Sequence, residues 1–99
     1  MNHIIAESII EDYILDLKIP HRVTYKNSLW FAQMSYSVWA AEEVLNYVRN
    51  NQNRPVIYVI EEFVMKMNRY SYINNDTSYV FSVAKDIAED ILDIFLAAQ

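Results

Sequence analysis

Apolar residues recur at intervals of three and four positions along four segments of the chain, and this is the period of an α-helix with one buried face. The segments cover residues 3–18, 28–48, 56–70 and 77–97. Pro20 ends the first segment, because the residue before a proline resists helical backbone angles, and Pro55 suits the first turn of the third. The pattern therefore predicts an all-α fold, either a four-helix bundle or a bundle-like helical array.

An α+β fold is the alternative. Residues 23–25 have side chains typical of a strand and could pair with residues 56–60 in a short two-stranded hairpin. The helical period that begins at Val56 continues through Tyr70, however, and a strand would not keep it. The third segment is therefore predicted to be helical.

The second segment is unusual because it carries two apolar stripes. Residues of the first stripe follow one another at helical spacing: Phe31, Met34, Val38, Ala41, Leu45 and Val48. Residues of the second stripe are Leu29, Ala32, Tyr36, Ala40 and Tyr47, with Trp39 on its flank. A helix that is apolar nearly all round must be covered on more than one side. We expect it to be either the central helix of the domain or the helix through which two copies meet.

The second stripe is the candidate protein interface. On this hypothesis Leu29, Tyr36, Trp39, Ala40 and Tyr47 stay on the outside of the protomer and bind another chain, most simply a second copy of the same chain. Tyrosine and tryptophan are favoured at interfaces, and eight tyrosines exceed what a core of this size can hide with satisfied hydroxyls. Tyr58 and Met65 also fall on the polar side of their helix. The alternative is that the other three helices simply surround this one.

An acidic face is predicted on the fourth helix, where the carboxylates gather within about 100° of arc. Its residues are Asp86, Glu89, Asp90 and Asp93. A functional interpretation is a cation site, or the surface of an inhibitor or immunity-type protein that offers phosphate-like spacing to a basic, nucleic-acid-binding partner. The simpler interpretation is a solvated helix face, since cation sites usually draw carboxylates from several elements.

Length, charge and composition narrow the function classes. The 99 residues fit a single domain, and the net charge of −5 disfavours binding to nucleic acid or to anionic membranes. The N-terminus lacks the basic start of a signal peptide and no apolar run approaches a membrane span, so a cytoplasmic location is expected. The asparagine- and isoleucine-rich composition is compatible with an AT-rich bacterial or phage genome.

Candidate catalytic chemistry is sparse. The chain has no cysteine and no glycine, which excludes thiolate chemistry and glycine-rich phosphate loops. Without glycine, Asn50, Asn51, Asn74 and Asn75 are expected to end helices in the left-handed conformation. The histidines, His3 and His21, do not follow a glutamate by three positions, as a bundle di-metal site requires. We expect no catalytic, cofactor-binding or metal-binding residues, no small-molecule substrate, and an enzyme only as the third hypothesis.

Overall fold

The computed structural model describes residues 2–18, 28–73 and 78–98, and for residues 28–33, 73 and 78 it describes only the backbone. These residues form four helices: α1 (His3–Lys18), α2 (Ser28–Arg49), α3 (Val56–Ile73) and α4 (Ser78–Ala97). The four predicted helices are confirmed, with ends within three residues of those expected. The fold is all-α.

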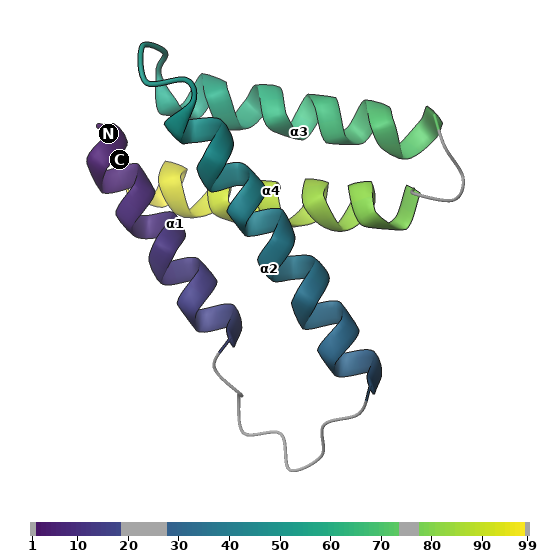
Figure 1. The fold of residues 1–99 in the computed structure, drawn as a ribbon. Coiled ribbons are helices and arrows are strands. Elements are labelled where there is room, and N and C mark those ends of the chain that lie inside the picture. The colour runs from purple at the N-terminus through teal and green to yellow at the C-terminus, as the bar shows by residue number, and fades with distance from the viewer. Residues whose placement is uncertain (1, 19–27, 74–77, 99) are drawn as a thin grey trace.

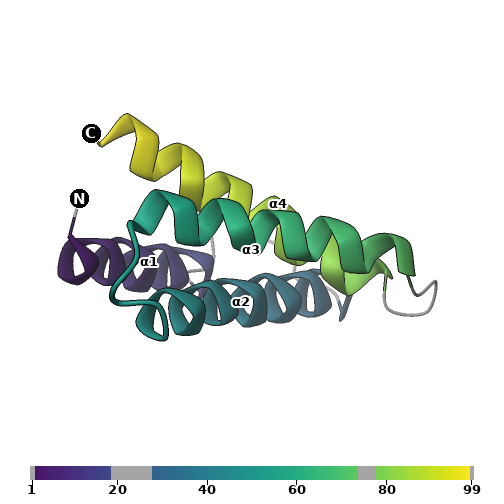
Figure 2. The ribbon, with the colours of Figure 1, turned by 90° about the horizontal axis from the view of Figure 1, so that it is seen from above.

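The helices are arranged as two crossed pairs (Figure 1). α1 packs along α2, α3 packs along α4, and the main contact between the pairs is that of α2 with α4. Figure 2 shows the two pairs as separate layers, with α3 and α4 in one layer and α1 and α2 in the other. The molecule measures 42 × 34 × 21 Å, and its thinnest dimension is that of two helix layers of about 10 Å each. Each helix therefore keeps one face that no layer of the same protomer covers.

The core lies between the two layers and takes side chains from all four helices. Its largest fully buried side chains are Phe95, Ile10, Ile60, Ile91, Val44, Val48 and Val59. The helical period predicts an apolar face on α1 made of Ala6, Ile9, Ile10, Tyr13, Ile14 and Leu17. It is confirmed, since Ala6, Ile10 and Ile14 are buried and the other three pack against the cluster. The helical period also predicts that Tyr70 and Ile94 face inward, and this is wrong, since they are 41% and 40% exposed. Both lie in the last turn of their helices, where fewer neighbouring residues remain to cover a side chain.

The alternative α+β fold is wrong, because residues 56–60 are the first two turns of α3. Its other half, residues 23–25, lies outside the described residues. The predicted left-handed helix ends are also wrong for Asn50 and Asn51, since no described residue has a positive φ angle. Instead, the Asn51 side-chain amide donates to the Tyr47 carbonyl oxygen at 2.7 Å and so satisfies one of the last carbonyls of α2. Asn74 and Asn75 lie outside the described residues.

Polar side chains also shape the start of α1. The Asn2 Oδ1 atom accepts a hydrogen bond from the Ile5 amide at 2.8 Å, which satisfies one of the free amides of the first turn. The helix α3 begins at Val56, and the Pro55 carbonyl accepts its first helical hydrogen bond, from the Val59 amide. Pro55 is therefore the N-cap residue rather than a residue of the first turn. Among the described helices, none combines the length and the apolar character needed to span a membrane.

Candidate interaction surfaces

The predicted interface on α2 is only partly exposed. Tyr36 and Trp39 are 39% and 37% exposed, whereas Ala40 is 0% exposed, so the placement of Ala40 on the outside is wrong. The physical reason is its spacing: Ala40, Val44 and Val48 are four residues apart and form one buried row on the side of α2 that meets the other helices. Tyr47 is half-buried. The side chain of Leu29 lies outside the described part of the chain.

Tyr36 does not stand alone on this surface. Its ring meets the ring of Tyr79 from α4 edge to face, with centroids 5.7 Å apart, and Tyr79 is itself exposed. Edge-to-face contact is a preferred arrangement of aromatic pairs and fixes both rings. We call Tyr36, Trp39 and Tyr79 the α2 aromatic face. It is smaller than the predicted stripe and includes a residue from a second helix.

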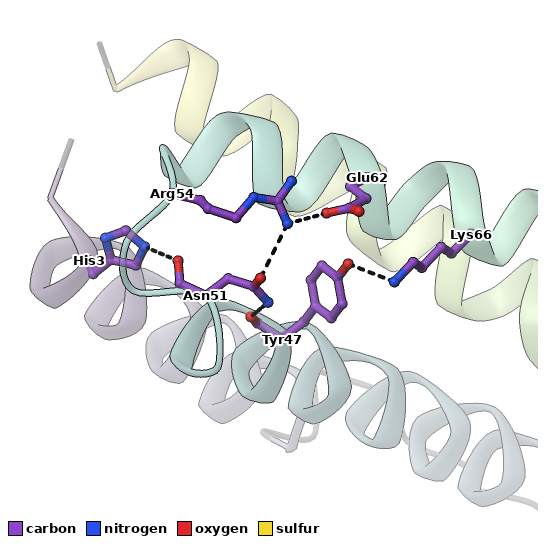
Figure 3. A network of polar contacts seen from close by, with 6 residues as sticks. All are labelled: His3, Tyr47, Asn51, Arg54, Glu62 and Lys66. Carbon is purple, nitrogen blue, oxygen red and sulfur yellow. Dashed lines mark hydrogen bonds and ion pairs between the residues drawn. The ribbon is translucent and has the colours of Figure 1, made fainter.

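Tyr47 takes part in a polar network where α2 ends and α3 begins (Figure 3). The Lys66 ammonium donates to the Tyr47 hydroxyl at 2.9 Å, and the Tyr47 ring packs against Phe63. Arg54 donates to the Asn51 side chain at 3.2 Å and forms an ion pair with Glu62 at 2.5 Å. Sequence patterns gave no sign of this network, since its members come from two helices and the connection between them.

The electrostatics of the network favour a structural role. The pKa of Glu62 is held below its ordinary value, first by the hydrogen bond with Arg54 and then by that with Tyr47. The pKa of Lys66 is raised, mainly by its hydrogen bond with the Tyr47 hydroxyl. A carboxylate kept ionised by a neighbouring guanidinium is a weak base at neutral pH. This cluster therefore joins α2 to α3 and is poorly suited to proton transfer.

The lowered pKa of Glu62 predicts a loss of stability in acid. Ionised Glu62 stabilises the fold above its ordinary pKa of 4.5, and this contribution is lost as the pH falls through the lower folded value. In urea unfolding at stepped pH, the native chain should lose more stability between neutral and acid pH than E62Q does. The D16N variant, altered at an exposed position of α1, should follow the native chain. Equal acid losses in native and E62Q proteins would contradict a native-state role for this pair.

A second set of polar contacts joins α1 to the end of α2. The Arg49 guanidinium donates to Glu7 and to Glu11, each at 2.8 Å, and these acids lie one turn apart on α1. His3 lies 3.0 Å, through Nε2, from the Asn51 carbonyl oxygen. Exposed ion pairs contribute little singly. Together these contacts join the first half of α1 to the end of α2.

The predicted acidic face of α4 remains a surface feature. Asp86, Asp90 and Asp93 are exposed and Glu89 is half-buried, 4.0 Å from the Lys85 ammonium. Asp90 accepts a hydrogen bond from the Tyr13 hydroxyl of α1 at 3.3 Å. Within the described ranges no group of three or more histidine, aspartate or glutamate side chains is placed to hold a metal ion. One of the four acids thus has a contact that joins two helices.

Tyr13 should titrate far from an ordinary tyrosine. Burial, then the charge of Asp90, then their hydrogen bond raise its pKa to about 12. A raised pKa means that the neutral phenol stabilises the fold fully below about pH 10 and that this contribution is lost as the pH rises through 12. NMR titration of labelled tyrosine rings should show the shift for Tyr13, reduced in D90N. It should remain partly raised there, since burial is the largest cause. An ordinary value in the native chain would contradict the Tyr13–Asp90 contact.

Three large apolar side chains are well exposed on the outer face of α3. Tyr58 and Met65 are each 65% exposed and Tyr72 is 81% exposed. The exposure of Tyr58 and Met65 agrees with their predicted place on the polar side of the helix. Tyr72 was missed because the predicted helix ended at Tyr70, two residues short of it. A shallow hollow of about 390 Å³ adjoins the first two; it is lined by Arg54, Pro55, Tyr58, Glu61, Glu62 and Met65.

Similarity to known proteins adds nothing to these surfaces. No protein-family model, curated protein or solved structure matches the chain.

Proposed function

We propose that this protein acts by protein–protein contact, as a non-enzymatic homodimer. One observation carries the proposal: large apolar side chains are well exposed on a small two-layer protein, with Tyr58, Met65 and Tyr72 at 65–81%. Scattered exposed apolar residues are ordinary, but aligned tyrosine and methionine side chains on one helix face are typical of interaction sites. The α2 aromatic face is a further exposed surface of the same kind.

Light scattering tests the proposal. The native chain at high micromolar concentration should have a mass approaching twice the 11.7 kDa of the monomer. A mass that stays at that of one chain at every concentration would overturn it.

The α2 aromatic face is the surface that the sequence favours for the dimer. Its support in the fold is Trp39, which lies beside Tyr36 one turn along α2 and is partly exposed. If two copies meet there, W39A should weaken the dimer at least tenfold, because truncating a tryptophan at the centre of an interface commonly costs about 2 kcal/mol of binding free energy or more. L15A, altered at an exposed position of α1, is the matched control and should leave the dimer unchanged.

The acidic face of α4 supports a second candidate, binding of a basic, nucleic-acid-binding protein. Three exposed aspartates on one side of a helix favour it. On this candidate the double charge reversal D86K/D93K, which leaves the Tyr13–Asp90 contact in place, should release a basic protein retained by the immobilised native chain. Retention of the same protein by the variant would exclude the candidate.

A further inference from the structure

The outer face of α3 carries a strip that is symmetric about Met65. Tyr58 lies seven residues before Met65 and Tyr72 lies seven residues after it, while Glu61 and Arg69 lie four before and four after. At 100° per residue these five positions fall within about 80° of the helix circumference. All five are exposed. We call them the α3 strip.

We propose that the α3 strip is the contact between two copies, with the two α3 helices antiparallel and a two-fold axis beside Met65. This inference rests on the proposed homodimer and assigns its surface. In a two-fold contact the same surface meets itself, so a residue before the axis on one copy faces the residue equally far after the axis on the other. Tyr58 of one copy then faces Tyr72 of the second, and Met65 faces Met65.

Charge complementarity supports a second copy of the chain, rather than an unrelated protein, as the partner at this surface. In the antiparallel register, Arg69 of each copy lies level with Glu61 and Glu62 of the other. Glu62, which pairs with Arg54 of its own copy, flanks the strip on the same side as Arg69, about 20° away in helical angle. Opposite charges therefore meet at both ends of the contact. A parallel pair would instead place Arg69 against Arg69 and the glutamates against each other, which disfavours that arrangement.

Shape supports the same register. The hollow beside Tyr58, Glu61 and Met65 lies on the half of the strip before the axis. Tyr72, the most exposed large apolar side chain in the described part of the chain, lies on the half after it. The two-fold axis brings Tyr72 of each copy to the hollow of the other, so each copy supplies one projecting ring and one recess.

The contact is small, and this sets its strength. A standard interface buries about 800 Å² per partner, and a contact through one helix face buries less than this. We therefore expect a dimer that forms and dissociates reversibly in the micromolar range.

Disulfide trapping tests the register, and the absence of native cysteine makes single-cysteine variants unambiguous. Two Met65 positions meet at the axis, so M65C chains should cross-link under mild oxidation. Two Tyr58 positions lie fourteen residues of rise apart, about 21 Å, and a disulfide spans at most about 7 Å between Cα atoms. Y58C alone and Y72C alone should therefore not cross-link above L15C, the control for random collision. A mixture of Y58C and Y72C chains should cross-link. Circular dichroism checks that each variant is folded.

The outcomes separate the two proposals. Trapping of M65C and of the Y58C/Y72C mixture, with little for Y58C alone, is the expected result. If native protein is dimeric by light scattering but M65C cross-links no faster than L15C, or Y58C cross-links with itself, the α3 contact is overturned and the homodimer stands on another surface. If native protein is monomeric at every concentration, both proposals are overturned.

Discussion

Replacing Phe95 with alanine should lower the free energy of unfolding by about 3–5 kcal/mol. Phe95 is the largest fully buried side chain in the described core, although it lies only four residues from the C-terminus of the chain. Its ring holds the last turn of α4 against the rest of the core. The substitution removes the favourable burial of the ring and leaves a cavity in the core. The loss is large because the whole stability of a small domain is only about 5–15 kcal/mol.

The adjacent residue supplies the control. Leu96 is also large and apolar but is 49% exposed, so L96A should change stability by no more than about 0.5 kcal/mol. In thermal unfolding followed by circular dichroism, F95A should melt more than about 10 °C below the native chain, while L96A should melt close to it. Equal melting temperatures for the two variants would mean that the end of α4 is not docked.

The second large effect is expected at Ala40, where sequence pattern and structure disagree. A glutamate placed on an exposed interface stripe would leave the protomer stable. Ala40 is instead fully buried, so A40E should cost about 3 kcal/mol or more through overpacking and burial of a carboxylate. The destabilisation should be smaller in acid, because burial raises the pKa of the new carboxyl and favours its neutral form.

Urea unfolding of A40E beside S35E measures this effect. Ser35 is exposed on the same helix, and a glutamate there should change stability by no more than about 0.5 kcal/mol. If A40E is as stable as S35E, Ala40 faces solvent and the packing of α2 given above is wrong.

The fold could be predicted from the sequence because the helical period alone selects which residues face inward. It placed Ile10, Ile60, Ile91 and Phe95 correctly, since each lies near the middle of its apolar face. The period placed Ala40 wrongly, because Ala40 lies at the edge of the second stripe of α2, on the side nearer the first stripe. Whether such a residue is buried depends on how closely the neighbouring helices approach, and a side chain as small as alanine permits either outcome.

Contacts between helices were beyond prediction for a related reason. The Arg49 contacts with Glu7 and Glu11, and the Lys66 contact with Tyr47, join residues 19 to 42 positions apart. Their pairing depends on the register and crossing of whole helices, which local patterns do not contain. The exposed position of Tyr72 on α3 was missed because the exact end of a helix is difficult to predict from sequence. With it, the symmetry of the α3 strip about Met65 becomes visible in the sequence.

Self-association through α3 is tested most directly by sedimentation equilibrium of the native chain beside M65E. Met65 is exposed in the protomer, so M65E should keep the helix content of the native chain. The two new carboxylates would repel each other across the two-fold axis and so weaken only the dimer. We expect the native chain to move reversibly from 11.7 kDa toward twice that mass across the micromolar range, and M65E to need at least tenfold higher concentration. A native chain that stays monomeric, or an M65E variant that dimerises as well as the native chain, would contradict the account.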